Sequence, residues 1–379
     1  MKILFLDQSG KPGGAELCLI DIAKPYRDSC LVGLFVDGAF RQLLEQQQIP
    51  VEVLATEAIK VRKESSLIQS LSSVTALLPL IAKVVQKARQ YDLIYANTQK
   101  ALVVGALASF FSRRPLVYHL HDILSTDHFS PTNLKVAVTL ANRFASLVIA
   151  NSQASQAAFL EAGGRSDIID VVYNGFEPEI YQSDRTNSQL KAQLELDGQF
   201  IVGHFSRLSP WKGQHILIEA LTYCPKDVTA ILVGDALFGE QDYVQQLHKQ
   251  VAELGLENRV KFLGFRSDIP QLMAICDLVA HTSIAPEPFG RVIVEAMLSG
   301  IPIVAAQSGG AIELIEPGIN GFLVPPGKPQ QLAEVINTCY NQPEYTIAIA
   351  QSAQEMATRR FHQTNIDRQI ADLLSRTFT

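Results

Sequence analysis

The sequence predicts an α/β protein made of two doubly wound parallel sheets. Short β-rich apolar runs alternate with helix-like segments almost throughout the 379 residues, and this alternation is typical of parallel α/β layers. The pattern restarts near residue 200, so that each half carries its own series of strands. The length also favours two domains, because domains usually contain roughly 100–200 residues.

The two series of expected strands can be read directly from the sequence. In the first half they are KILFLD, CLVGLFV, VEVLA, LIYAN, LVYHLHD, LVIANS and DVVYNG, and in the second FIVGHFSRL, TAILVGD, VKFLGF, LVAHTS, IPIVAA and GFLVPP. The polar stretch 179–198 between them is interpreted as the interdomain connection. We expect an N-terminal domain over 1–185, a C-terminal domain over 186–360, and an amphipathic helix over 361–379 that packs back on the first domain.

Composition excludes several classes of protein. The net charge of −6 and the pI near 5.8 argue against nucleic-acid binding, which needs a basic surface. The five cysteines are odd in number and scattered without a C-x-x-C pair, which indicates reduced thiols in the cytoplasm and no disulfide framework or zinc site. The start of the chain does not resemble a signal peptide, because charge and glycines interrupt it early.

The longest apolar stretch, 66–86, allows two interpretations. Its apolar residues recur at helical spacing, at Leu67, Leu71, Val74, Leu78, Ile81 and Val85. The polar residues that interrupt it, with Lys83, make it a poor membrane span. The first interpretation is a helix that packs on a sheet. The second is a helix that rests on an acidic membrane surface, since basic residues follow it.

The first strand is followed by a glycine-rich loop at Gly10, Gly13 and Gly14. A glycine loop before a helix exposes backbone N–H groups to an anion, and the helix dipole adds to the attraction. The spacing does not fit G-x-G-x-x-G, but Asp37 follows the second strand, where a dinucleotide-binding acid would lie. A phosphate site, a dehydrogenase and a tight turn without a ligand all remain open for this loop.

The stretch YHLHD at the end of a strand contains two histidines on one strand face, His119 and His121, followed by Asp122. A histidine and an aspartate at the carboxyl end of a strand are candidates for polar contacts with a substrate. As a metal pair, the histidines lack a clear third ligand in the sequence apart from His128. A purely structural role is the alternative.

The loop after the first strand of the second half places Arg207 and Lys212 before a glycine, Gly213, at the turn into a helix. Arginine can hold a diphosphate by paired hydrogen bonds, and lysine as a point charge. Solvated surface charges are the alternative. Trp211, the single tryptophan, is expected to pack the loop.

The stretch APEPFGRVIVEAMLSG carries two glutamates, Glu287 in a loop and Glu295 in the first two turns of an apolar helix. They are either surface charges or ligands, and carboxylates are good acceptors for sugar hydroxyls. A second glycine loop, AAQSGGAIEL, follows the next strand. No D-x-D pair occurs in the sequence, which favours chemistry without a metal.

Taken together, the motifs GGAE, SRLSPWKG, E-x7-E and the glycine loop after it resemble glycosyltransferase family 4, over the whole chain and most strongly over 200–330. The resemblance implies a GT-B fold, in which two Rossmann-like domains face each other across a cleft, and a retaining, metal-independent enzyme without a cofactor. The whole-chain likeness is to bacterial, in particular cyanobacterial, exopolysaccharide glycosyltransferases. The sequence departs from the family pattern at HTSIAPEPFG, where Thr282 and Ser283 replace a proline–serine pair, and we expect this to alter only the loop.

The resemblance also implies a role for each matching residue. The catalytic residues would be His121, Arg207, Lys212 and Glu287. The donor would be bound by Gly13, Gly14, Arg207, Lys212, Phe289, Gly290 and Glu295, with Glu287 on the sugar hydroxyls and Glu295 on the ribose. The acceptor side would include Glu16 and His119, and His119 replaces His121 as the active-site histidine if the alignment is shifted by one strand period.

The function expected from these residues is hexosyl transfer from a UDP-sugar, UDP-glucose first, to a lipid-linked or polysaccharide acceptor in envelope or exopolysaccharide synthesis. The protein would work in the cytoplasm, in peripheral contact with the inner face of the membrane, and without nucleic acid as a partner. A nucleotide-sugar epimerase of the same fold is an alternative, and an NAD-dependent oxidoreductase is a second one.

Overall fold

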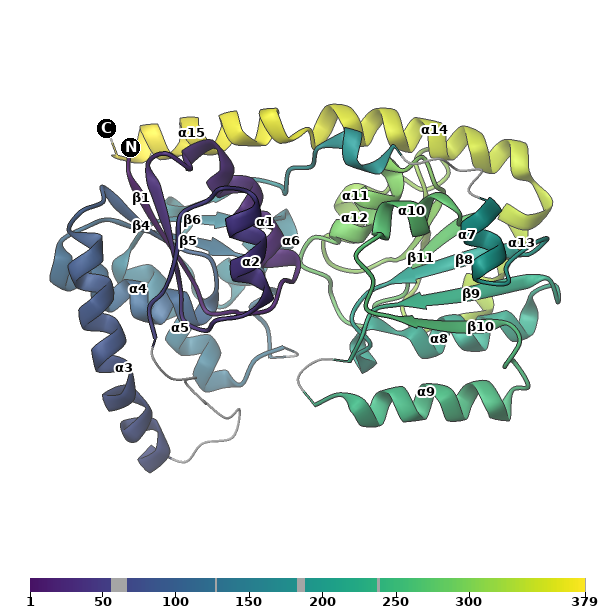
Figure 1. Cartoon of the computed structure of the whole chain (residues 1–379), viewed down its shortest axis with the longest axis horizontal. Coiled ribbons are helices and arrows are strands. Elements are labelled where there is room, and N and C mark those ends of the chain that lie inside the picture. Colours follow the sequence, from purple (N-terminus) through teal and green to yellow (C-terminus); the bar gives the residue numbers. More distant parts are fainter. Residues whose placement is uncertain (56–66, 127, 183–187, 237–238, 379) are drawn as a thin grey trace. The chain divides into compact units, whose positions relative to one another are not determined.

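The structure, a computed structural model, describes the chain except residues 56–66, 127, 183–187, 237–238 and 379, and except the side chains of 67–76. It contains two compact units: unit 1 is Met1–Gly175 with Gln363–Thr379, and unit 2 is Phe176–His362. Each unit is a parallel sheet covered by helices, which confirms the predicted fold class (Figure 1).

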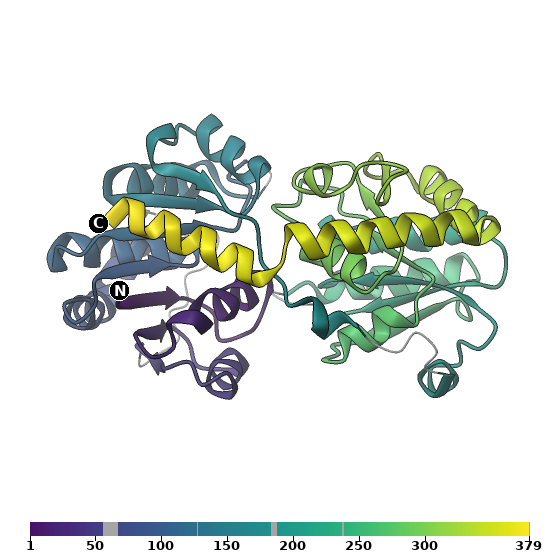
Figure 2. The same cartoon turned by 90° about the horizontal axis from the view of Figure 1, so that it is seen from above.

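The chain passes between the units at 175–176 and at 362–363, earlier than the boundary expected at 185–186. The start of the supposed connection belongs to unit 2 because Phe176 packs there: its ring lies 6.3 Å from that of Phe289, which in turn lies 5.9 Å from Phe361. The C-terminal helix α15 (Gln363–Phe378) belongs to unit 1, where Ile366, Ile370, Leu373 and Leu374 join the core. Figure 2 shows α14 and α15 as consecutive helices at the end of the chain.

Unit 1 has a sheet of seven strands in the order β3-β2-β1-β4-β5-β6-β7. The strands are β1 (Ile3–Asp7), β2 (Cys30–Leu34), β3 (Val51–Val53), β4 (Leu93–Ala96), β5 (Leu116–Leu120), β6 (Ala145–Ala150) and β7 (Ile169–Val171). Successive residues of β1 pack on opposite faces of the sheet. Leu4 and Leu6 belong to the hydrophobic core on one face, and Ile3 and Phe5 belong to the core on the other. Both faces are therefore apolar, as a parallel sheet requires.

Helices cover both faces of this sheet. They are α1 (Gly14–Ala23), α2 (Ala39–Gln46), α3 (Leu67–Ala88), α4 (Gln99–Ser112), α5 (Pro131–Phe144), α6 (Gln153–Glu161) and α15, with short 3₁₀ turns η1 (Lys24–Tyr26) and η2 (Ser166–Ile168). Several start at a polar cap: Ser152 Oγ, for example, accepts a hydrogen bond of 2.9 Å from the backbone N–H of Ser155 at the start of α6.

Residues 67–86 of the apolar stretch lie in α3, so the predicted helix is present, and residue 66 lies outside the described residues. Leu80, Ile81, Val84 and Ala88 pack into the core of unit 1, so the end of the helix packs on the sheet. Leu78, expected on the same apolar face, is 55% exposed instead. The predicted apolar positions Leu67, Leu71 and Val74 lie outside the described side chains.

Unit 2 has a sheet of six strands in the order β10-β9-β8-β11-β12-β13. The strands are β8 (Phe200–Phe205), β9 (Val228–Val233), β10 (Val260–Gly264), β11 (Leu278–His281), β12 (Ile303–Ala306) and β13 (Phe322–Val324). The helices are α7 (Ser188–Gln193), α8 (Gln214–Ala220), α9 (Gln241–Glu253), α10 (Ile269–Ala274), α11 (Arg291–Leu298), α12 (Ala311–Leu314), α13 (Pro329–Asn341) and α14 (Pro343–Arg360), with η3 (Pro178–Tyr181), η4 (Pro210–Lys212) and η5 (Leu221–Tyr223).

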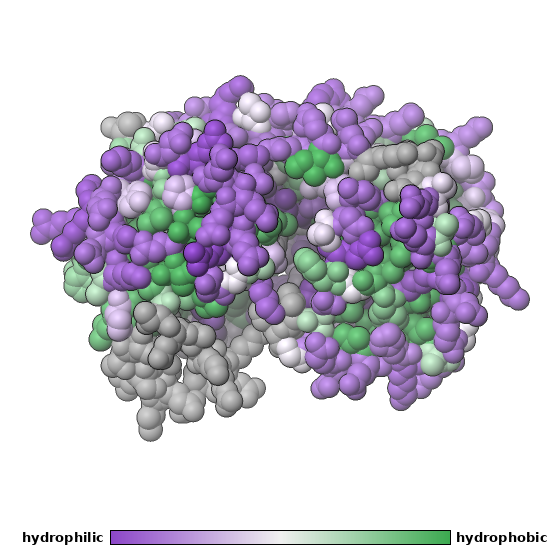
Figure 3. Space-filling model, in the orientation of Figure 1, coloured by the Kyte–Doolittle hydropathy of each residue, from purple (hydrophilic) through white to green (hydrophobic). Residues whose placement is uncertain are grey.

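The helices of unit 2 are amphipathic where they meet water. In α9 the buried residues are Tyr243, Leu247 and Val251, spaced four apart on one face. Figure 3 shows hydrophilic side chains over the opposite face of this helix. Within the described residues, no helix combines the length and the apolarity needed to cross a bilayer.

Strand order locates the candidate site in each unit. In unit 1 the order reverses between β1 and β4, and in unit 2 between β8 and β11. The loops after these adjacent strands lead to helices on opposite faces, which opens a crevice at the carboxyl ends, where ligands of doubly wound sheets bind. Asp7, Asn97, Ser206 and Thr282 all lie at or directly after these ends.

Candidate functional site

A chain of three polar side chains lies at the crevice of unit 1. Asp7 ends β1 and Asn97 follows β4, and Asn97 Nδ2 donates a hydrogen bond of 2.7 Å to Asp7 Oδ2. Asn97 Oδ1 lies 2.9 Å from His121 Nε2, from the loop after β5. Asp7, Asn97 and His121 are thus connected across three neighbouring strands of the sheet.

The carboxylate of Asp7 determines the orientation of this chain. It accepts from the Asn97 amide group and, at 2.7 Å, from the backbone N–H of Ser9, so the amide must present its NH₂ group to Asp7. The amide oxygen then faces His121, whose Nε2 donates to it. The other nitrogen, Nδ1, is left as the basic one of the neutral imidazole.

Glu16, in the first turn of α1, lies close to Asp7. Burial, and then the charge of Asp7, raise the pKa of Glu16 to about 7, and burial raises the pKa of Asp7 to about 6. A Cβ at Gly13 would lie 2.8 Å from Glu16 Oε2, so a larger residue there would displace the carboxyl group. Two buried acids side by side titrate near neutral pH, which is a property of catalytic and binding sites.

His119, the other histidine of this pair, is buried. It is 2% exposed, and its Nδ1 lies 2.9 Å from the hydroxyl of Tyr95. Burial, with a smaller effect of His121, holds the pKa of His119 well below its ordinary value, so the ring is neutral. The rings of His119 and His121 are adjacent as predicted, 3.9 Å apart, but only His121 is partly exposed.

Gly10, the first glycine of the loop in unit 1, allows this loop to pack closely against another one. A Cβ at Gly10 would lie 2.4 Å from the carbonyl oxygen of Asp37, so Gly10 permits a close backbone contact with the loop after β2. Asp37 itself is exposed and pairs with Arg41 at 3.3 Å. Gly13 precedes α1 and Gly14 is its first residue.

In unit 2, Glu287 is the centre of the candidate site. Its Oε2 accepts from Lys212 Nζ at 2.6 Å and from Ser283 Oγ at 3.0 Å, and it lies 3.2 Å from His281 Nε2. The side chains of Lys212 and Glu287 are only 14% and 13% exposed. The two residues predicted to hold the diphosphate and the sugar therefore contact each other directly.

The pKa of Glu287 reflects these contacts. Burial alone would raise it, but the charge of Lys212 and the hydrogen bonds from His281 and Lys212 outweigh burial and hold the pKa well below its ordinary value. Glu287 is consequently ionised at any physiological pH. An ionised carboxylate in a buried polar site is a strong acceptor for hydroxyl groups.

Arg207 lies in the same loop as Lys212, and Trp211 lies beside both. The Lys212 Nζ atom is 4.0 Å and the Arg207 guanidinium carbon 6.0 Å from the centroid of the Trp211 ring, consistent with a packing role for the indole. Arg207 Nε also lies 3.6 Å from Glu240. Its exposure of 28% leaves the guanidinium accessible to an anion.

The E-x7-E motif spans the start of α11. Gly290 precedes this helix with φ +95°, a conformation that glycine adopts readily, and the buried ring of Phe289 anchors the loop in the aromatic cluster with Phe176. Glu295 lies one turn into α11, 3.6 Å from Arg291. Burial raises the pKa of Glu295 although Arg291 opposes the shift.

The second glycine loop, at Gly309 and Gly310, lies against the backbone of Glu287. Gly310 N–H donates to the carbonyl of Glu287 at 2.7 Å, and a Cβ at Gly309 would lie 2.3 Å from that same carbonyl oxygen. The loop therefore supports the backbone of Glu287. The helix that follows, α12, has four residues, too few to present an N-terminal anion site.

The substitution at HTSIAPEPFG does more than alter the loop. Ser283 contributes a hydrogen bond to Glu287, and Thr282 Oγ1 donates to the carbonyl of Gly213 at 2.8 Å, which ties β11 to the start of α8. Sequence reasoning also missed His281, Asp7 and Asn97. Their positions at the carboxyl ends of β11, β1 and β4 are a signal that could have identified them.

Comparison with known proteins places the chain in a family. The family described as "Glycosyltransferase Family 4" matches residues 12–180, and that described as "Glycosyl transferases group 1" matches 186–356. The crystal structure of HepE from Anabaena in complex with UDP-glucose is 67% identical, with a TM-score of 0.93, over 99% of this chain and 100% of that one. The chain belongs to the family 4 glycosyltransferases. The predicted family, enzyme class and GT-B fold are therefore confirmed.

Two other similar proteins have lower sequence identity. D-inositol 3-phosphate glycosyltransferase of Corynebacterium glutamicum (strain R) is 26% identical over 70% of this chain and 68% of that protein. Spore coat protein SA of Bacillus subtilis is 32% identical over 50% of this chain, and the match spans 54% of that protein. HepE of Anabaena has also been crystallised with UDP, and with UDP and glucose.

Proposed function

We propose that this glycosyltransferase moves glucose from UDP-glucose to a sugar acceptor, lipid-linked or part of a polysaccharide, in envelope or exopolysaccharide synthesis. The observation that carries the proposal is the contact of Lys212 with Glu287, supported by His281 and Ser283. It joins a cation suited to a diphosphate with an ionised acceptor suited to sugar hydroxyls. The 67% identity with HepE of Anabaena, which binds UDP-glucose, supports this donor.

In this proposal each residue of unit 2 acts on a different part of the donor. Lys212 and Arg207 neutralise the diphosphate, Glu287 accepts hydrogen bonds from the hexose, and Glu295 accepts them from the ribose. The backbone at Phe289 and Gly290 completes the hexose contact. Because the lysine and the arginine supply the positive charge, the reaction proceeds without a bound metal or cofactor.

The transfer retains the configuration of the sugar. The bond between the anomeric carbon and the diphosphate oxygen breaks, and the acceptor hydroxyl forms its bond to that carbon on the same face. The proton of the hydroxyl passes to the departing diphosphate oxygen. Catalysis then depends on positioning and on cations placed where negative charge develops.

The residues of unit 1 serve the acceptor and the reacting sugar. His121, held by Asn97 and partly exposed, is the active-site histidine, and buried His119 supports it. Glu16, with a pKa near 7, is suited to exchange hydrogen bonds with acceptor hydroxyls as either donor or acceptor. Gly13 and Gly14 leave room for the diphosphate and the sugar at the start of α1.

The experiment that tests the function measures UDP release from UDP-glucose in the presence of EDTA, with ADP-glucose and GDP-glucose as controls. The enzyme should hydrolyse UDP-glucose slowly, and faster than ADP-glucose or GDP-glucose. Proton NMR of the released glucose should show the α anomer before mutarotation. Release of the β anomer would contradict retention. Conversion of UDP-glucose into another UDP-hexose without UDP release would indicate an epimerase.

We propose that the enzyme works in the cytoplasm at the inner face of the membrane, with α4 as the contact. Phe110 and Phe111 near the end of this helix are 63% and 60% exposed, and Arg113 and Arg114 follow them. Exposed aromatic rings beside basic residues suit an anionic bilayer surface. Sedimentation with anionic vesicles should fall in Phe110→Ser/Phe111→Ser and persist in the control Phe265→Ser, which alters an exposed ring of unit 2.

A further inference from the structure

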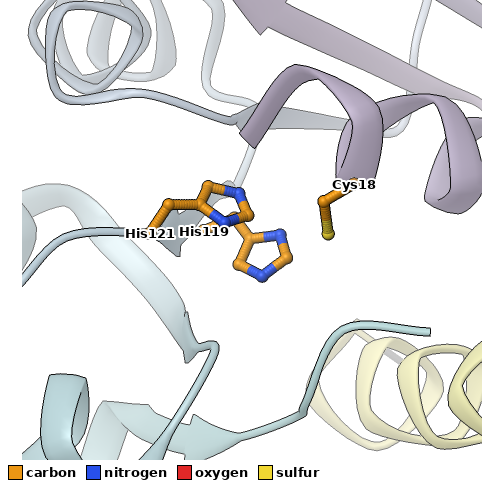
Figure 4. A group of neighbouring side chains, drawn as sticks. All are labelled: Cys18, His119 and His121. Carbon is orange, nitrogen blue, oxygen red and sulfur yellow. The ribbon is translucent and has the colours of Figure 1, made fainter. Parts of the chain in front are cut away.

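Unit 1 contains a cluster of three possible metal ligands, one of which is His121, the active-site histidine of the proposed function. Cys18 of α1, His119 of β5 and His121 each offer one ligand atom, and these atoms all lie within 4.8 Å of one another. Figure 4 shows the two imidazoles side by side and Cys18 extending toward them from the neighbouring helix. Neither the scattered cysteines nor the histidine pair indicated this group in the sequence, where His128 was the candidate third ligand.

One buried nitrogen of this cluster is unsatisfied. Among the described residues, His119 Nε2 has no hydrogen-bond partner, although the residue is only 2% exposed. A buried polar atom without a partner costs about 1–3 kcal/mol, so such atoms in native proteins usually have a reason. A metal ion bonded to Nε2 would provide one.

Both histidines are already oriented as metal ligands usually are. His119 Nδ1 lies 2.9 Å from the hydroxyl of Tyr95, and His121 Nε2 lies 2.9 Å from the amide oxygen of Asn97. Ligating histidines almost always donate their other ring N–H to an oxygen in this way, which fixes the tautomer and the ring orientation. His119 Nε2 and His121 Nδ1 are then the ligand atoms.

The cysteine completes the set. Cys18 is 2% exposed, and its Sγ lies 3.3 Å from Asn174 Oδ1, so the thiol donates to the amide oxygen. On metal binding the thiol proton passes to solvent, and rotation of the amide would turn its NH₂ group toward the thiolate. A tetrahedral site with bonds of about 2.0–2.3 Å needs ligand atoms about 3.4–3.7 Å apart, which small side-chain rotations can supply.

We propose that Cys18, His119 and His121 form a binding site for a borderline-soft divalent cation of the Zn²⁺ type. One thiolate and two imidazoles prefer zinc over Mg²⁺ or Mn²⁺, and the partly exposed side of His121 leaves a fourth position for water. The ion would occupy a nitrogen of His121. Its binding is therefore inhibitory to transfer rather than part of it.

The test uses cobalt as a spectroscopic substitute for zinc on the reduced full-length protein, and it does not depend on any transferase activity. Wild type should develop the thiolate-to-cobalt charge-transfer band and the visible bands of tetrahedral cobalt, and one equivalent of zinc, but not of magnesium, should remove them. The charge-transfer band should be lost in Cys18→Ser and retained in the control Cys30→Ser, another buried cysteine of unit 1. His119→Gln should weaken cobalt binding at least about tenfold.

Two results would overturn the proposal. One is the absence of the charge-transfer band in wild-type protein. The other is its persistence in Cys18→Ser, which would assign the thiolate to a different cysteine. Cys18→Ser changes a single atom, so the comparison remains decisive if His119→Gln fails to fold.

Discussion

Replacing Lys212 by methionine should have two separable effects, one on stability and one on catalysis. The lysine and Glu287 form a pair with 14% and 13% of their side chains exposed, 2.6 Å apart. Removing one partner of a buried pair costs about 3–5 kcal/mol, because the other charge stays buried without compensation. His281 and Ser283 still contact the carboxylate, so we expect a loss of about 3 kcal/mol in the free energy of unfolding.

The catalytic effect has a different origin. Without the ammonium group, the negative charge that develops on the diphosphate loses a preorganised donor, which costs on the order of 10²–10³-fold in kcat. Lys212→Ala should show the same loss. In the double variant Lys212→Met/Glu287→Gln no charge is left unpaired, so most of the stability should return while the activity should not.

Chemical denaturation and steady-state UDP release would measure the two effects on the same preparations. Lys261→Met is the control, because its partner Glu195 is 86% exposed and such a surface pair contributes only about 0–1 kcal/mol. Near wild-type turnover in Lys212→Met would refute the assignment of this lysine to the diphosphate. Recovery of turnover in the double variant would refute it as well.

Three further predictions follow from the structure. The pKa of Glu16 is raised from 4.5 to about 7, so the folded state favours the protonated carboxyl group, and this contribution to stability is lost as pH rises through this range. Between pH 5 and pH 8 the unfolding free energy of wild type should fall by about 2–3 kcal/mol more than that of Glu16→Gln. Chemical denaturation of both proteins at the two pH values would measure the difference. Gly213→Ala should lower the melting temperature more than Gly198→Ala, because both glycines have positive φ but only at Gly213 would a Cβ meet a backbone oxygen, at 2.0 Å. Asn97→Ala should reduce kcat on the order of 10- to 100-fold through loss of His121 positioning, with little change in the KM for UDP-glucose, and an equal rise in KM would argue for a donor contact instead.

The sequence was sufficient to predict the strands, but not to predict which strands lie next to each other in the sheets. Apolar runs of β-rich residues marked every strand that the structure describes, because a strand buried on both faces leaves a continuous apolar signal. Which strands lie side by side depends on the crossovers, and no local pattern encodes that. Asp7, Asn97 and His121 are 90 and 24 residues apart along the chain, and only the sheet order brings them together.

In the candidate site, too, some residues could be predicted from the sequence, but their contacts could not. Lys212 and Glu287 could be identified from motifs that resemble a family, but their direct contact depends on the packing of β8 beside β11. Cys18 gave no signal at all, since one cysteine on an amphipathic helix is ordinarily a core residue. The glycine loop at Gly309 was identified by its composition, but its backbone contact with Glu287 required the structure.

The central claim is that unit 2 binds a nucleotide sugar with Glu287 on the hexose, and calorimetric titration of wild type and Glu287→Gln with UDP-glucose and with UDP tests it most directly. We expect Glu287→Gln to bind UDP-glucose at least about tenfold more weakly, since a charged acceptor contributes about 1.5–3 kcal/mol per hydrogen bond, and to bind UDP as well as wild type does. Equal losses for both ligands, or unchanged affinity for UDP-glucose, would contradict this account.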